Sequence, residues 1–367
     1  MTTVSDHSPV PADLLIDVQD LRVSFRTDEG LITPVDGVTF QVRKGKTLGI
    51  VGESGSGKSV STRALVKLLP KNAIVDPDSK ILFYNNGNGT PVDITMLAAN
   101  SKEIRRIRGG EIGMIFQEPM ASFSPVYTIG NQIVEAVRQH RIASMSPLAA
   151  TATVGSQIME GMLAQQKISK GDARDIAVEM LERVGISNAG MRVDQYPHEL
   201  SGGMRQRAMI AVALSTHPQM LIADEPTTAL DVTIQAQIVD LMKALQAELG
   251  MSIIFITHDM GLISKVADEI AVMYLGVIVE RGPTDALIDS ATHPYTRGLL
   301  AAIPRLDNLK RRLTPVGGDI PGPLERPAGC PFHPRCPHFK PSVCDAAMPE
   351  RTAISSSHFV RCYLYEE

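Results

Sequence analysis

Short apolar runs alternate along this chain with longer runs of helical spacing. The apolar runs have the length of strands buried on both faces and lie at Leu48–Val51, Glu111–Phe116, Met220–Ala223 and Ser252–Thr257. The runs of helical spacing lie at Val60–Leu69, Ile129–His140, Asp172–Val184 and Ala208–Leu214. This alternation predicts an α/β fold with a parallel sheet covered on both faces. The carboxyl ends of its strands would converge on one edge, where ligands bind in such folds.

The N-terminal part of the chain has a different pattern. Leu15–Val18 and Leu21–Phe25 alternate apolar and polar residues, and Val35–Val42 has the character of a partner strand. We therefore expect a small antiparallel sheet beside the glycine-rich loop at residues 52–59. Residues 1–13 are mostly polar and lack an apolar signal core, so we expect a disordered lead-in. Residues 143–166 carry little charge, and we interpret them as an insertion with a helical portion.

The most specific motif joins the first buried strand to the first predicted helix. Residues 52–59 read G-E-S-G-S-G-K-S, the pattern of a phosphate-binding loop in its strand–loop–helix setting. Glycines let successive N–H groups turn toward an anion, and the helix N-terminus adds a positive dipole. Lys58 would reach the β- and γ-phosphates, and Ser59 would ligate Mg²⁺. The residues expected to hold a nucleoside triphosphate are Gly52, Ser54, Gly55, Ser56, Gly57, Lys58 and Ser59; the alternative is a plain glycine-rich turn.

Polar residues also follow three later strands. Gln117 comes after the second buried strand, Asp224 and Glu225 end the third, and His258 follows the fourth. A glutamine in this position can bond Mg²⁺ and the attacking water, while Asp224 suits Mg²⁺ and Glu225 can polarise water. His258 could touch the γ-phosphate. Taken singly, Gln117 is more often an ordinary loop residue and His258 a structural one.

A second small-residue turn, Leu200–Met204, also leads into a predicted helix and offers a second anion site. One chain needs only one such site for each nucleotide. The turn is therefore either an unrelated helix start or a surface offered to the nucleotide of another molecule. Phe25 could stack on an adenine, although a core position suits it at least as well.

Length, composition and charge limit the classes of protein to which this chain could belong. The chain has 367 residues, 44% of them hydrophobic, which is enough for one large domain and an appendage. The net charge of -4 gives no general attraction for nucleic acid. No apolar run approaches the roughly 18 residues that span a bilayer, so we expect a cytoplasmic chain attached to a membrane only through partners.

All four cysteines lie close together in the sequence, at Cys330, Cys336, Cys344 and Cys362. Cytoplasmic chains seldom keep disulfides, so clustered thiols favour a metal. The spacing lacks the C-x2-C pairs of structural zinc sites, and four thiolates suit a [4Fe–4S] cluster. Zinc and free thiols remain alternatives. Such a cluster would hold the tail together, with redox sensing left open.

In this order, the motifs resemble those of ATP-binding subunits of ABC transporters, from about Leu15 to about Leu287. The matching elements are the phosphate loop Gly52–Ser59, the Q-loop Gln117, the signature Leu200–Met204, the Walker B acids Asp224 and Glu225, the D-loop Ala229–Asp231 and the switch His258. The resemblance implies a P-loop NTPase domain at 14–288, with a RecA-like core, an antiparallel β subdomain and a helical subdomain at about 120–205. The rest of the chain, residues 289–367, would form a small C-terminal extension that contains the cysteines.

The resemblance also implies how the two anion sites work together. Two cassettes pair head to tail, so that each ATP lies between the phosphate loop of one subunit and the signature of the other. Ser201, Gly202 and Gly203 would then contact the partner's nucleotide. Gln117, Glu225 and His258 would serve catalysis on the chain's own ATP, with Glu225 activating the in-line water.

A narrower resemblance covers the C-terminal part. His293–Leu300 and Pro327–Pro337 look like the oligopeptide/dipeptide importer subgroup, which also includes nickel and some oligosaccharide or opine importers. It implies an ATPase that energises peptide uptake at the cytoplasmic face of the membrane. The implied partners are a second homologous cassette, two permeases and an extracytoplasmic binding protein. Some members carry a [4Fe–4S] cluster on such cysteines. A soluble ABC ATPase acting on nucleic acid is the less favoured alternative.

Overall fold

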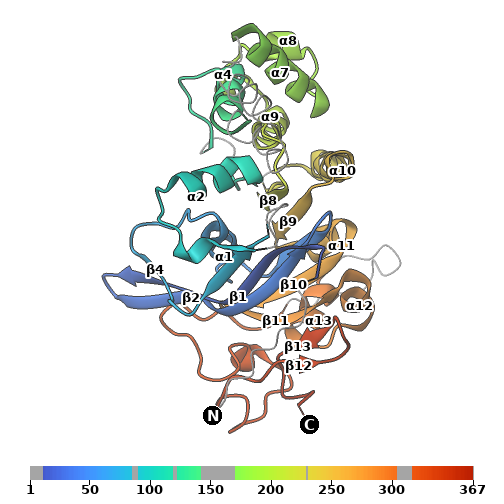
Figure 1. The fold of residues 1–367 in the computed structure, drawn as a ribbon. Helices are drawn as coiled ribbons and strands as arrows, with labels where there is room; N and C mark the ends of the chain where they lie inside the picture. The colour runs from blue at the N-terminus through green and yellow to red at the C-terminus, as the bar shows by residue number, and fades with distance from the viewer. Residues whose placement is uncertain are drawn as a thin grey trace.

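The computed structural model describes residues 11–84, 90–118, 122–141, 170–228, 230–303 and 316–366. Two β-sheets form the body of the molecule, and a group of helices extends from one end of it (Figure 1). The predicted insertion at 143–166, most of the predicted disordered lead-in and Ala229 of the predicted D-loop lie outside the described residues.

The main sheet has eight strands among the described residues, in the order β12-β13-β11-β10-β3-β9-β8-β7. Five neighbouring strands are parallel: β10 (Glu269–Tyr274), β3 (Thr47–Val51), β9 (Ser252–Thr257), β8 (Met220–Asp224) and β7 (Ile112–Ile115). All four buried strands predicted from the sequence are confirmed.

The predicted parallel sheet is confirmed for these five strands, and the structure adds an antiparallel edge that was not predicted. Three strands extend the sheet in the antiparallel sense: β11 (Val277–Pro283), β13 (Phe359–Val360) and β12 (Thr352–Ala353). The reason lies in the turn between β10 and β11, which consists of Leu275 and Gly276. Both residues have positive φ, 40° and 84°, as a two-residue hairpin turn requires, and such a turn can join only antiparallel strands.

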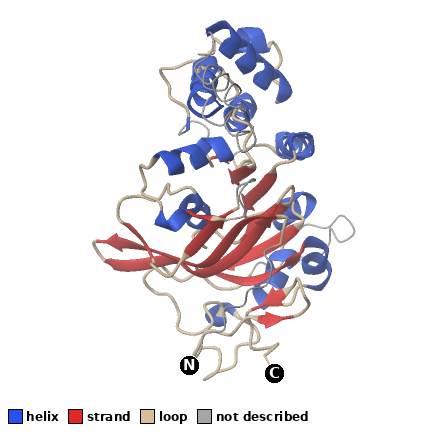
Figure 2. Cartoon of the chain, in the orientation of Figure 1, coloured by secondary structure: helices blue, strands red, loops and turns tan. Residues whose placement is uncertain are grey.

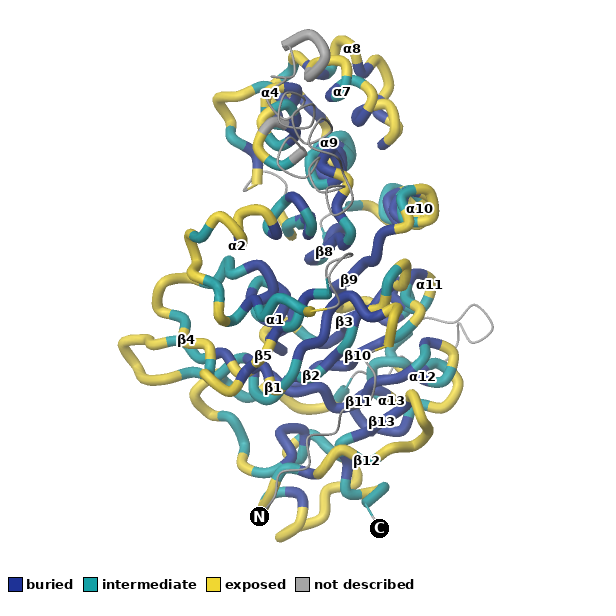
Figure 3. The backbone as a smooth tube through the Cα atoms, viewed as in Figure 1, coloured by how far each residue is buried: buried dark blue, intermediate teal, exposed yellow. Residues whose placement is uncertain are grey.

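Each face of the main sheet covers its own hydrophobic core. In β8, Met220 and Ile222 belong to one core, while Leu221 and Ala223 belong to the other, because side chains alternate along a strand. The buried segments of Figure 3 run through the sheet between layers of exposed chain. The predicted covering of the sheet on both faces is therefore confirmed.

A second sheet of antiparallel strands covers one face of the main sheet. The predicted antiparallel pairing of the N-terminal strands is thus confirmed. The second sheet runs β2 (Gly30–Arg43), β1 (Leu14–Thr27), β5 (Lys80–Phe83) and β6 (Val92–Asp93), with β4 (Ala73–Val75) on β1. This sheet reaches the phosphate loop, since a Cβ added at Gly57 would lie 2.1 Å from the carbonyl oxygen of Pro34 on β2.

Helices fill the remaining layers (Figure 2). Around the sheets lie α1 (Lys58–Leu65), α2 (Lys102–Arg106), α10 (Val232–Leu249), α11 (Met260–Val266), α12 (Thr284–Ser290) and α13 (Pro294–Ala301). The extending group contains α4 (Ile129–Ala136), α7 (Lys170–Arg183), α8 (Ala189–Arg192) and α9 (Gly202–Leu214). The described residues also form short 3-10 helices and π turns. The 3-10 helices are η1 (Ile94–Met96), η4 (Pro197–Glu199) and η6 (His333–Arg335), and the π turns are η2 (Ile107–Glu111) and η3 (Val137–Arg141).

The predicted helix at Val60–Leu69 begins two residues earlier and stops at Leu65, because Lys67 has a φ of 49° that a helix cannot accommodate.

The C-terminal part is tied to the main sheet by a buried carboxylate. Glu280 on β11 is fully buried and accepts hydrogen bonds from Thr292 N at 2.7 Å and Thr292 Oγ1 at 2.6 Å. It also accepts one from His293 N at 3.0 Å, and His358 Nε2 lies 2.9 Å away. Burial alone would raise the pKa of Glu280, but these hydrogen bonds outweigh it and lower that pKa. The carboxylate thus holds three distant segments together.

We expect Glu280→Ala to lower the free energy of unfolding by about 3 kcal/mol, because several buried donors lose their acceptor. Urea unfolding at pH 7 measures this, with the exposed Asp289→Ala as the matched control. Since folding lowers the pKa of Glu280, its contribution is present at neutral pH and is lost as the pH falls through the folded value. Equal stability of the two variants at pH 7 would contradict this role.

Candidate nucleotide-binding site

The phosphate loop, residues 52–59, joins β3 to the start of α1, as its motif predicts. Gly55 and Gly57 have φ of 78° and 97°, in the left-handed region that favours glycine. Gly52 is constrained in another way, because a Cβ there would lie 2.2 Å from the carbonyl oxygen of Met273 on β10. The loop therefore needs glycine at these positions to curve tightly beneath the helix N-terminus, where an anion is favoured.

Lys58 lies inside this loop with 4% of its surface exposed. Its Nζ donates to the carbonyl oxygens of Gly52 at 2.7 Å and Glu53 at 3.0 Å. The same nitrogen is 4.0 Å from Glu225 Oε1. Burial lowers the pKa of Lys58, against the opposing effect of nearby carboxylates, Glu225 foremost. This cation is positioned to meet phosphate oxygens that enter the loop.

Ser59 and Asp224 form the part of the site that suits a metal ion. Ser59 Oγ donates to Asp224 Oδ1 at 2.7 Å, and the Asp224 carboxylate is fully buried. Asp224 Oδ2 lies 3.5 Å from an Arg63 guanidinium nitrogen and has no hydrogen-bond partner among the described residues. Burial raises the pKa of Asp224, while the bond from Ser59 and the charge of Arg63 oppose that rise. A hydroxyl beside an under-satisfied carboxylate oxygen fits Mg²⁺, which prefers oxygen ligands.

The polar residues at the strand ends meet around Glu225. Gln117 Nε2 donates to Glu225 Oε2 at 3.0 Å, and Thr228 Oγ1 donates to the same oxygen at 3.0 Å. His258 Nδ1 lies 3.6 Å from that oxygen. Glu225 has a φ of 48°, an uncommon backbone conformation for a residue with a side chain and one that tends to occur at functional sites. Thr228 was not singled out by sequence reasoning, although a hydroxyl three residues after the acid is a local signal for this contact.

Two other groups of predicted residues lie outside this cluster. Ser201 caps α9, where its Oγ accepts a hydrogen bond from Met204 N at 3.4 Å. Gly202 is exposed, and a Cβ there would meet nothing within 4 Å among the described atoms. Helix α9 packs on α4 and α7 and lies away from α1 (Figure 1), so the fold does not bring the signature to the phosphate loop of its own chain. Phe25 lies on β1 opposite Ile32 and packs partly buried against the core between the sheets.

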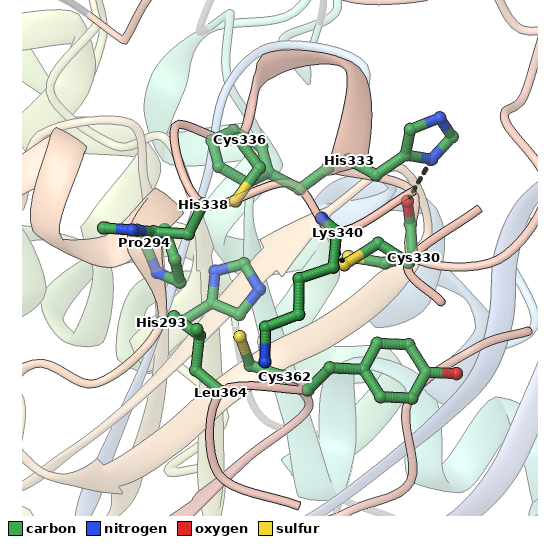
Figure 4. Close-up of a pocket in the computed structure, with 12 residues that line it drawn as sticks. His293, Pro294, Cys330, His333, Cys336, His338, Lys340, Cys362 and Leu364 are labelled. Carbon is green, nitrogen blue, oxygen red and sulfur yellow. Dashed lines mark hydrogen bonds between the residues drawn. The ribbon is translucent and has the colours of Figure 1, made fainter. Parts of the chain in front are cut away.

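The four cysteines line one cavity of the C-terminal part, together with His293 and Phe332 (Figure 4). Burial raises the pKa of the Cys330 thiol to about 12 and lowers the pKa of His293 to about 4. His293 Nδ1 accepts a hydrogen bond from Tyr295 N at 3.1 Å, which leaves the ring proton on Nε2. That buried Nε2 has no partner among the described residues.

The predicted metal-ligand set of the cysteines is not supported. Across the part of the chain that the structure describes, no three His, Cys, Asp or Glu side chains are arranged to hold a metal ion. The spacing of the cysteines brings their thiols to one cavity but does not by itself fix ligand geometry.

A separate finding concerns the membrane: no described helix is both long and apolar enough to cross one.

Comparisons with protein families match two parts of the chain. The model described as ABC transporter matches residues 35–228. The model described as oligopeptide/dipeptide transporter, C-terminal region, matches residues 279–344. The second match begins within the strand β11 and includes the helix α13 and three of the four cysteines.

Similar proteins cover nearly the whole chain. A protein of Brucella melitensis named as a peptide import ATP-binding protein is 45% identical over 96% of this chain and 98% of its own length. The dipeptide transport ATP-binding protein DppD of Bacillus subtilis is 44% identical over 96% of this chain and 95% of its own. The oligopeptide transport ATP-binding protein OppD of the same organism is 43% identical over 95% and 88%.

Solved structures share the fold. A dimeric structure of the ATP-binding cassette MJ0796, in a post-hydrolysis state bound to ADP and Pi, has a TM-score of 0.57 and 22% identity. It covers 74% of this chain and 99% of that one. The cbiO1 protein of Clostridium perfringens has a TM-score of 0.55 and 24% identity, and covers 76% of this chain and 92% of that one. These likenesses show the fold of an ATP-binding cassette.

We expect Lys58→Ala to weaken ATP binding at least about tenfold, because a buried cation no longer meets the phosphates. Titration with a fluorescent ATP analogue in the presence of Mg²⁺ measures the dissociation constant. The exposed Lys71→Ala is the matched control and should bind as the unaltered chain does. Unchanged affinity of the Lys58 variant would remove the phosphate loop from the site.

Proposed function

The chain belongs to the ABC transporter family, in its oligopeptide/dipeptide transporter branch, and from this premise we propose that it is the ATP-hydrolysing subunit of a peptide importer. The observation that carries the proposal is the meeting of Gln117, Thr228 and His258 around Glu225, next to the buried Lys58. The full-length similarity to proteins named for peptide, dipeptide and oligopeptide transport supports peptides as the cargo. Oligosaccharide, opine or nickel transport is the alternative within the same branch.

Each residue of the site has a distinct role in this proposal. The phosphate loop and Lys58 bind and neutralise the phosphates. Ser59, Asp224 and Gln117 would hold Mg²⁺, and that ion would offset the charge that develops on the phosphate oxygens. Glu225 orients and deprotonates the attacking water, and His258 sits beside it to contact the γ-phosphate. Catalysis then depends on positioning and charge rather than on a covalent step.

Completion of the site requires a second cassette. Ser201, Gly202 and Gly203 form the N-terminal turn of α9, a helix that lies away from α1 (Figure 1). Ser201 and Gly202 are exposed, so this helix N-terminus is accessible to an anion from outside the chain. We propose that they contact the ATP of a homologous partner subunit in a head-to-tail pair. In the same scheme the pair lies at the cytoplasmic face of the membrane on two permeases, which receive peptide from an extracytoplasmic binding protein.

We also propose a [4Fe–4S] cluster at the four cysteines, held by Cys330, Cys336, Cys344 and Cys362. The support is chemical: four thiols line one cavity, and the buried Nε2–H of His293 in the same cavity has no acceptor among the described residues, a role that the sulfurs of such a cluster would fill. The cluster would brace the tail.

Glu225→Gln should retain ATP binding and lose hydrolysis by about 100-fold or more, because an amide cannot accept the water proton. Phosphate release by the assembled transporter measures hydrolysis, and equilibrium binding measures affinity. Glu248→Gln, an exposed substitution at the end of α10, is the matched control. Normal turnover in the Glu225 variant would exclude this residue as the base.

Protein purified without oxygen should contain about four iron atoms per chain and absorb near 400 nm, as thiolate-bound iron–sulfur centres do. Elemental analysis and visible spectroscopy measure both. Cys336→Ser should lower the iron content, and this variant separates specific ligation from adventitious iron. One zinc per chain, or no metal at all, would contradict the cluster.

A further inference from the structure

The C-terminal part contacts the phosphate loop directly, through a side chain to which the scheme above gives no role. Arg335 is the last residue of η6, in the loop between Cys330 and Cys336. Its NH1 donates to Glu53 Oε2 at 2.6 Å, and its NH2 donates to Glu53 Oε1 at 3.0 Å. Glu53 is the second residue of the phosphate loop. The two partners lie 282 residues apart in the sequence.

The guanidinium of Arg335 is fixed from several sides. Its side chain is 3% exposed, and its carbon Cζ lies 5.7 Å from the ring centre of Tyr274 and 5.9 Å from that of Phe332. Nε donates to Gly317 O at 2.9 Å, and NH2 also donates to Val316 O at 3.2 Å. A bidentate, charge-assisted pair with these supports has one geometry, so it can hold the Glu53 side chain in a single position.

Glu53 passes that constraint to the nucleotide site through its backbone. Its N–H donates to the hydroxyl of Tyr295 on α13 at 2.9 Å. Its carbonyl oxygen accepts the bond from Lys58 Nζ at 3.0 Å. One residue therefore connects Arg335 and Tyr295, both from the C-terminal part, with the lysine that meets the phosphates.

Anchoring of the tail does not account for this ion pair. The tail is already attached by the pairing of β13 with β11 and by the buried Glu280 network. The Arg335 side chain is buried and that of Glu53 is 26% exposed, and taking charge out of water costs desolvation, so such a pair adds little stability compared with packed apolar side chains. The pair instead fixes the positions of its two side chains, and one of them, Glu53, is part of the phosphate loop.

We propose that Arg335 is a positioning residue for ATP: it holds Glu53 so that Lys58 and the loop N–H groups face the phosphates. The C-terminal part is then a structural component of the nucleotide site. This inference rests on the proposed ATPase function. It does not depend on the identity of any group at the cysteines.

The test is a double-mutant cycle on MgATP affinity, using the full chain and a fluorescent ATP analogue. Arg335→Gln and Glu53→Gln should each weaken binding about tenfold, the effect of one charge-assisted contact. The double variant should be no weaker than either single one, because both act through the same contact. Arg335→Lys should restore only part of the affinity, since an ammonium cannot form the bidentate pair.

The matched control is Arg351→Gln, the same substitution at a second arginine of the C-terminal part. Arg351 lies 3.5 Å over the ring of Phe359. It should lower the unfolding midpoint and leave ATP affinity unchanged. This separates positioning of the loop from a general loosening of the region.

Two results would overturn the inference: unchanged affinity in Arg335→Gln, or additive losses in the double variant. If the unaltered chain binds ATP and Lys58→Ala does not, while Arg335→Gln binds normally, the inference fails and the proposed function stands. If the unaltered chain itself fails to bind MgATP, the proposed function fails first.

Discussion

Two buried charges of opposite sign, Lys58 and Asp224, impose the constraint on which the rest of this structure depends. Buried charges are tolerated only when they are paired and hydrogen-bonded. Lys58 obtains its partners because the loop curves tightly enough to turn the carbonyl oxygens of Gly52 and Glu53 toward it. Asp224 obtains them because β8 ends beside the start of α1, where Ser59 lies in the first turn and Arg63 in the second. Strand order, glycine placement and helix start are therefore linked, and together they gather oxygen and nitrogen atoms that suit a metal-bound triphosphate.

The same site depends on elements that lie far from it in the sequence. Pro34 on β2 closes one side of the loop against Gly57, and β10 closes another through Met273. Arg335 and Tyr295 hold Glu53 from the C-terminal part. The signature, in contrast, begins α9 in the extending helical group, which lies away from α1. In the proposed head-to-tail scheme, a second cassette would supply the turn that completes the site.

Much of this arrangement could be predicted because its signals are local. Apolar runs of strand length predicted the central strands. The phosphate-loop motif and the polar residues at the strand ends predicted a cluster, and the fold does bring Gln117, Glu225 and His258 together. The antiparallel edge was not predicted, since β12 and β13 are two-residue strands with no readable period. Arg335 was missed because its partner lies 282 residues away, and only the folded chain brings them together. The cysteine spacing placed four thiols at one cavity, but ligand geometry depends on packing that spacing does not encode.

The central claim is that the triphosphate at Lys58 is completed by the serine–glycine turn of a facing cassette. A structure of the assembled transporter, prepared with the Glu225→Gln variant and MgATP, tests it most directly. Our account predicts that each γ-phosphate lies within hydrogen-bond distance of Lys58 of one cassette and of the signature turn of the other. A bound triphosphate with Ser201 remote from every phosphate would contradict it.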